Sequence, residues 1–252
     1  GALALNQTGG SITFTGNLDA ATLTAAANNF SVALQGGNNT ISGATTFNNT
    51  GTLTLGDGGD ATAFTGGVVA TAPSSKTING TVSAAGTGVI NLGTTGVSVT
   101  GDSTVGGTST GLVTLGNATL ADGVTLTLGA GAATPISTGS ISGTAAGAAS
   151  NVTINTTGAV TVGGAVGTDI GTLTITNSGG TTFQNTVNAA TIAITGTTLG
   201  NTVAFQGNTT ATSAMTVGAG AYNVSMTGSS NTIAGATTFN NTGTLTLGDG
   251  GD

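Results

Sequence analysis

Charged side chains are the first place to look for chemistry, and this chain of 252 residues has only nine of them, eight Asp and one Lys. The residues that most often supply acid–base catalysis or stabilise an oxyanion, namely His, Glu and Arg, are missing altogether. Two stacked aspartates could in principle hydrolyse a glycosidic bond, but Lys76 does not lie near an Asp cluster in the sequence. We therefore expect that the chain is not an enzyme and that it holds no cofactor. The aspartates are Asp19, Asp57, Asp60, Asp102, Asp122, Asp169, Asp249 and Asp252.

The segment Gly56-Asp57-Gly58-Gly59-Asp60 comes nearest to a metal-binding motif, and Asp249 and Asp252 repeat its two carboxylates. Two carboxylates together with turn carbonyls could bind Ca²⁺ weakly. The spacing differs from that of the calcium-binding Gly-Gly-x-Gly-x-Asp repeat, and the segment occurs once per long repeat instead of in a continuous run. We expect an ordinary Asp-Gly corner here, with these four aspartates as weak metal candidates only.

Short segments that alternate aliphatic residues with Thr, Ser or Ala recur along the whole chain and must position any site. Thr52-Leu53-Thr54-Leu55 and Leu173-Thr174-Ile175 are examples, and such alternation is typical of strands with one buried face. Turns rich in Gly and Asn, such as Gly36-Gly37-Asn38-Asn39, separate them. The scarcity of Glu, Lys and Arg argues against helices. The composition therefore predicts an all-β fold.

The end of the chain repeats its beginning. Residues 38–60 read NNTISGATTFNNTGTLTLGDGGD and residues 230–252 read SNTIAGATTFNNTGTLTLGDGGD, an offset of 192 residues. Such self-similarity is the signature of a tandem array. We expect residues 1–252 to form one continuous segment cut from a longer repetitive chain.

Aromatic residues suggest a finer period. From Phe14 through Phe30 and Phe47 to Phe64, a phenylalanine recurs about every 17 residues. We interpret this as a parallel β-solenoid with coils of about 17–22 residues, in which the rings stack inside one wall. With a rise of about 4.8 Å per coil, 192 residues would make about 11 coils and roughly 55 Å. The alternative is a row of tandem β-sandwiches. The full expected ladder is Phe14, Phe30, Phe47, Phe64, Phe183, Phe205, Tyr222 and Phe239.

Strings such as GATTFNNTGTLTLGDGG and TLTITNSGGTTFQNTVNAATIAITG resemble the repeats of giant bacterial surface proteins, which include filamentous-haemagglutinin-like adhesins and autotransporter passengers. This resemblance covers most of the chain and implies a right-handed parallel β-helix that is secreted and displayed as a fibre or stalk. It carries no functional residues with it.

These observations lead to the expected function, a structural segment of an extracellular filament, stalk or cell-surface fibre. Its partners would be neighbouring repeats or identical chains, and a host or neighbouring cell surface is a further candidate. A single cation argues against nucleic-acid binding, and no apolar run is long enough to span a membrane. The segment begins without a signal peptide, so we expect any secretion signal to lie outside it.

Two other functions remain open at this stage. The solenoid wall could itself act as an adhesin that binds cell-surface glycans or another cell. Repeated Thr-x-Thr motifs could alternatively form an ice-binding face, which would require the motif to recur in register from coil to coil. The four clearest motifs are Thr22-Leu23-Thr24, Thr52-Leu53-Thr54, Thr125-Leu126-Thr127 and Thr172-Leu173-Thr174.

Overall fold

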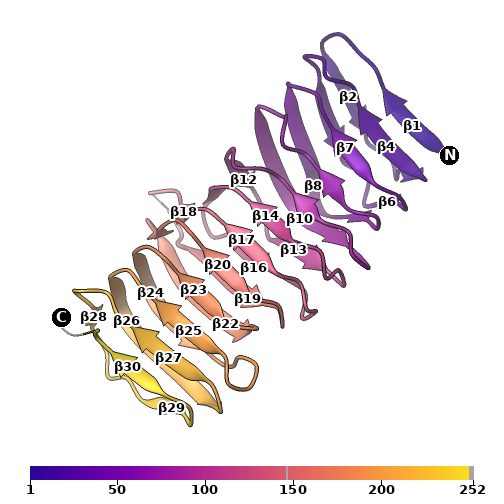
Figure 1. Cartoon of the computed structure of the whole chain (residues 1–252). Helices are drawn as coiled ribbons and strands as arrows, with labels where there is room; N and C mark the ends of the chain where they lie inside the picture. Colours follow the sequence, from indigo (N-terminus) through magenta and orange to yellow (C-terminus); the bar gives the residue numbers. More distant parts are fainter. Residues whose placement is uncertain (146, 250–252) are drawn as a thin grey trace.

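The computed structural model describes residues 1–145 and 147–249, and in this part of the chain the fold is a parallel β-solenoid. The described residues form strands and no helix, so none of them belongs to a helix that could cross a membrane. Figure 1 shows the coils stacked in sequence order from the N-terminus to the C-terminus. The strand pairs are parallel along the whole stack, which confirms the predicted solenoid and excludes antiparallel sandwiches.

Each coil crosses three ladders of paired strands, which we call faces 1, 2 and 3 in the order that the chain visits them. Face 1 is one continuous sheet of 12 strands, so the solenoid makes 11 turns between its first and last strand. Faces 2 and 3 belong to a second sheet, in which long strands such as β8 (Thr52–Phe64) bend from one face to the next.

The strands of face 1 are β1 (Ala2–Leu5), β4 (Thr22–Ala25), β7 (Thr45–Phe47), β9 (Val68–Val69), β11 (Ile90–Asn91), β14 (Val113–Leu115), β17 (Ile136–Thr138), β20 (Val160–Val162), β23 (Thr181–Phe183), β25 (Thr202–Phe205), β27 (Asn223–Met226) and β30 (Leu245–Leu247). Face 2 contains β2 (Ser11–Phe14), β5 (Ser31–Leu34), β12 (Val97–Val99), β15 (Ala118–Leu120), β18 (Ile141–Gly143), β21 (Val166–Gly167) and β28 (Thr232–Ile233). Face 3 contains β3 (Asp19–Ala20), β6 (Asn38–Ile41), β13 (Ser103–Gly107), β16 (Thr125–Leu128), β19 (Ser150–Asn155), β22 (Ile170–Asn177) and β29 (Phe239–Asn241). Four strands pass from face 2 to face 3, namely β8, β10 (Ser75–Ala84), β24 (Val187–Ile194) and β26 (Thr209–Gly220).

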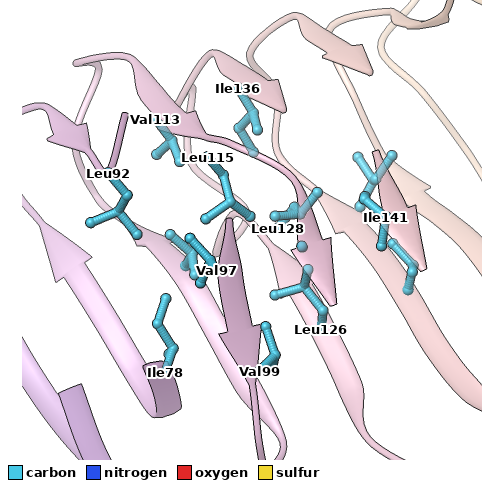
Figure 2. Packing of buried hydrophobic residues seen from close by; sticks show 14 of the residues in the cluster. Ile78, Leu92, Val97, Val99, Val113, Leu115, Leu126, Leu128, Ile136 and Ile141 are labelled. Carbon is cyan, nitrogen blue, oxygen red and sulfur yellow. The ribbon is translucent and has the colours of Figure 1, made fainter. Parts of the chain in front are cut away.

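The core is a column of aliphatic side chains inside the coils. In β16 the side chains of Leu126 and Leu128 are fully buried, whereas the intervening Thr127 is only partly buried. Figure 2 shows Leu126 and Leu128 in the buried cluster that also includes Val99 of the preceding coil and Ile141 of the following one. The period-two alternation that predicts the strands therefore also separates the apolar interior from a hydroxyl-rich exterior.

The coil is longer than the aromatic spacing suggests. On face 1, Ala2 is in register with Thr22 and Ile136 with Val160. One coil therefore takes about 20–24 residues. The long repeat thus spans fewer than nine coils, and the expected value of about 11 coils per long repeat is wrong. At about 4.8 Å per coil the long repeat rises by roughly 42 Å and not by the expected 55 Å.

The corners between faces are held by glycines and buried amides. Gly56 has a φ of 84°, and a Cβ atom there would lie 2.1 Å from the backbone oxygen of Asn79 in the next coil. Asn39 is 1% exposed; its Nδ2 donates to the carbonyl of Gly36 at 2.8 Å, and its Oδ1 accepts the amide of Leu18 in the preceding coil at 3.0 Å. Amides such as Asn39 thus bind the backbone of the corner and the adjacent coil, which fixes the path of the chain between faces.

Candidate functional site

The Asp57–Asp60 corner is the bend of β8 between faces 2 and 3. The backbone amide of Asp57 donates to Oδ2 of Asp60 at 2.8 Å, which folds the two carboxyl groups toward one another. A side-chain hydrogen bond to the Asp60 carboxylate raises the pKa of the Asp57 carboxyl above its ordinary value, with smaller contributions from burial and from the charge of Asp60. The corner thus places two carboxyl groups close together, the exposed one of Asp57 and the partly buried one of Asp60.

The other two metal candidates do not join this corner. Asp249 follows β30, near the opposite end of the solenoid from Asp57, and Asp252 lies outside the described residues. Among residues 1–145 and 147–249, no group of three or more His, Cys, Asp or Glu side chains is close enough to hold a metal ion. The residues that the structure describes thus bring together two of the four candidates, Asp57 and Asp60.

The aspartates share a location that sequence reasoning missed. Six of them lie where the chain passes from face 2 to face 3, either in the turn or at the first residue of the face 3 strand, and we call this line the acidic edge. Asp249 is different, because it follows a face 1 strand. Neighbouring coils contribute Asp102, whose Oδ1 accepts the amide of Thr125 at 2.8 Å, and Asp122, whose Oδ1 accepts the hydroxyl of Thr144. The acidic edge consists of Asp19, Asp57, Asp60, Asp102, Asp122 and Asp169.

Lys76, the only lysine, points into the core and is 2% exposed. Its neighbours in register are Leu53 in the preceding coil and Val97 in the following one. Nζ donates to the carbonyl of Pro73 at 3.1 Å and to the hydroxyl of Thr95. Burial lowers the pKa of the Lys76 ammonium below its ordinary value. The outer surface of the described coils therefore carries no lysine or arginine side chain to balance the acidic edge.

The aromatic side chains do not form the expected ladder. The strand register brings only Phe183 and Phe205 of face 1 into stacked contact, with ring centroids 5.0 Å apart and ring planes 8° apart. Phe47 on face 1 instead meets Phe64 on face 3 edge to face, with centroids 6.2 Å apart. The 17-residue spacing is shorter than a coil, so residues separated by it fall on different faces.

The remaining aromatic residues also lie apart from one another. Phe14 is on face 2 and Phe239 on face 3, and both are only partly buried against the core. Phe30 and Tyr222 are 1% exposed and lie at corners, and the Tyr222 hydroxyl donates to the carbonyl of Gly218 at 2.6 Å. Burial raises the pKa of Tyr222. These rings fill the core at separate positions.

The Thr-x-Thr motifs are distributed over all three faces. Of the four motifs, only those at Thr125–Thr127 and Thr172–Thr174 share a face, face 3. Outward positions in register with Thr127 form a longer row of small polar residues, broken by one alanine. In order along the axis this hydroxyl row is Thr104, Thr127, Thr153, Thr174, Ala193 and Thr216.

Four surface grooves of the described coils add no charged side chain to these features. The grooves are shallow, and their linings are Gly, Ser, Thr, Asn and aliphatic residues with neither Asp nor Lys. One groove at the last coil is mainly apolar and is lined by Met226, Ile233, Phe239 and Leu247. A charged reactant would find no partner of opposite charge in them.

No protein-family model, curated protein or solved structure matches this chain.

Proposed function

We propose that the chain is a non-catalytic structural segment of an extracellular filament, stalk or surface fibre, as in giant bacterial β-strand-repeat proteins. The observation that carries this proposal is the unbroken ladder of 12 parallel strands on face 1. Every inner strand is hydrogen-bonded to the coils before and after it, so unpaired edges occur only at the two ends of the described stack. Such a ladder resists bending and extends by simple repetition.

The distribution of charge supports the same proposal. A net charge of −7 over 252 residues leaves self-repulsion between neighbouring fibres weak, and most of the outer wall is uncharged. Trypsin has a single possible cleavage site, at Lys76, and that side chain is 2% exposed. A long-lived extracellular scaffold benefits from both properties.

Electron microscopy of the source cells, labelled with antibodies raised against the purified chain, tests this proposal. We expect gold particles along extracellular fibres or a surface layer on unpermeabilised cells, with spacing that reflects repetition of the epitope. Cells lacking the gene are the control. Label confined to the cell interior, or the absence of any filament in labelled material, would contradict the proposal.

A second candidate function is adhesion by the solenoid wall, and the hydroxyl row on face 3 favours it. The row places hydroxyl groups at the inter-coil spacing over several coils, a pattern that a glycan-covered surface could meet with hydrogen bonds. Binding of the purified chain to a glycan array, compared with a variant carrying Thr127→Val, Thr153→Val and Thr174→Val, tests it. Inhibition of ice recrystallisation, measured with the same two proteins, tests the less favoured ice-binding function.

A further inference from the structure

The two copies of the long repeat lie on different faces of the solenoid. In the first copy, Leu53 and Leu55 lie on face 2, whereas their counterparts Leu245 and Leu247 lie on face 1. Phe47 lies on face 1 and its counterpart Phe239 on face 3. The same shift by one face relates β6 to β28, β5 to β27 and β4 to the second half of β26.

Contacts between successive coils are nevertheless the same in both copies. Nδ2 of Asn49 donates to the carbonyl of Phe30 at 3.0 Å, and Nδ2 of Asn241 donates to the carbonyl of Tyr222 at 3.0 Å. The pairing of β5 with β8 recurs between β27 and β30, with each partner shifted by one long repeat. Each sequence therefore keeps its neighbours in the adjacent coil and changes only the face on which it lies.

The shift follows from the number of faces in one long repeat. From β6 on face 3 to β28 on face 2 the chain makes 26 steps from one face to the next, which is eight and two-thirds coils. A face with its corner takes about seven residues and presents the same alternation of buried aliphatic and outer hydroxyl residues, so all three faces accept the same sequence. A repeat of 26 faces cannot return to its starting face, because 26 is not a multiple of three.

We propose that each long repeat is turned by one face relative to the previous repeat, so that a tandem array presents every repeated surface feature on its three sides in succession. The inference rests on the proposed function, a filament of tandem repeats. Three repeats, or 26 coils, return a feature to its first side after about 125 Å.

The acidic residues show what this arrangement does. Asp57 lies between faces 2 and 3, whereas its counterpart Asp249 follows the strand of face 1 and so lies on a different edge. In a tandem array this repeated corner winds around the filament and does not form a straight acidic stripe. A neighbouring filament or any other partner that recognises the corner therefore meets it from three directions.

Distances between pairs of spin labels on the isolated chain test the rotation. The chain has no cysteine, so introduced cysteines can be labelled without background. Thr46→Cys with Thr238→Cys joins two equivalent positions of the repeat. Thr46→Cys with Ser225→Cys, or with Thr246→Cys, joins outward positions of face 1 that lie eight and nine coils apart. Thermal unfolding of each variant checks that it folds.

The expected result is that the pair at 46 and 238 is farther apart than both face 1 pairs. Its axial separation is about 42 Å, less than the roughly 43 Å of the pair at 46 and 246, but the labels also lie on different faces. The sheet separation of about 10 Å and the outward reach of the labels give a lateral offset of roughly 20 Å. The distance between labels at 46 and 238 should therefore exceed that of the pair at 46 and 246 by about 3 Å.

A distance for 46 and 238 that falls between those of the two controls would place both residues on one face and overturn the rotation. This measurement needs no filament. A failure here therefore leaves the proposed function standing, and failure to find filaments on cells leaves the rotation standing.

Discussion

Replacing Lys76 by methionine should stabilise the chain. Methionine has nearly the length of lysine and no charge, and it would lie between Leu53 and Val97 in the core. Among the described residues no acidic side chain pairs with the ammonium, whose hydrogen-bond partners are the Pro73 carbonyl and the Thr95 hydroxyl. An unpaired buried charge is among the most costly groups in a protein interior.

The size of the effect follows from two opposing contributions. Replacing buried ionic groups by apolar side chains of similar volume often stabilises a fold by about 1–4 kcal/mol. The Pro73 carbonyl loses a hydrogen-bond donor, which costs about 1 kcal/mol. We therefore expect Lys76→Met to raise the free energy of unfolding at pH 7 by up to about 3 kcal/mol, taking the difference of these contributions.

The dependence on pH separates this mechanism from general improvement of packing. Because burial lowers the pKa of Lys76, the unfolded chain binds more protons than the folded chain between the lowered pKa and the unfolded value of about 10.4. The free energy of unfolding of the wild type should therefore rise as pH increases through this interval. Each unit by which the pKa is lowered corresponds to about 1.4 kcal/mol.

Urea unfolding at a series of pH values between neutrality and about 10.5 measures this difference. The free energy of unfolding of Lys76→Met should exceed that of the wild type at pH 7, and the two values should converge as pH rises. Ser75→Lys is the matched control, because it adds a lysine at an exposed neighbouring position and should introduce no such slope. Parallel curves for wild type and Lys76→Met would refute the argument that a buried ammonium destabilises this coil.

Three further substitutions test the packing of the coils. Phe205→Ala removes one ring of the stacked pair on face 1 and should lower the free energy of unfolding by about 3–5 kcal/mol in urea titrations; a loss below about 1 kcal/mol would contradict its place in the core. Gly56→Ala should destabilise the corner by more than about 1 kcal/mol, because φ is 84° and the added Cβ would clash with the next coil. Gly58→Ala is the control and should be close to neutral, because its Cβ would meet no neighbour. Equal melting temperatures of the two variants would argue against this structure of the corner. Asn39→Ala should cost about 2–4 kcal/mol, because it leaves buried backbone groups unpaired, and the exposed control Asn38→Ala should cost much less in the same thermal unfolding experiment.

The solenoid could be predicted from the sequence, because its pattern of strands and turns depends only on local alternation. Every coil buries the same kind of side chain on each face, so segments such as Thr125–Leu128 carry the signal wherever they lie. Lys76 could also have been placed from the sequence. It stands two residues before Ile78 in an alternating strand and thus shares the inward side of β10.

Coil length could not be derived from local alternation, because it depends on how many residues each corner takes. The interval from Phe47 to Phe64 measures the path from face 1 to face 3, two faces and not a full coil. The acidic edge was missed for the same reason, since aspartates separated by unequal intervals align only when the true coil length is known. Asp102, Asp122 and Asp169, for example, lie at the same corner of their coils. The chain nevertheless takes more residues per coil between Asp122 and Asp169 than between Asp102 and Asp122.

Electron diffraction from native filaments would test the central claim most directly, that this chain is a segment of a continuous solenoid fibre. The structure predicts a meridional reflection at about 4.8 Å from the coil spacing and a second one at roughly 42 Å from the long repeat. Filaments resolved as globular beads on flexible linkers, without the coil-spacing reflection along the fibre axis, would contradict it.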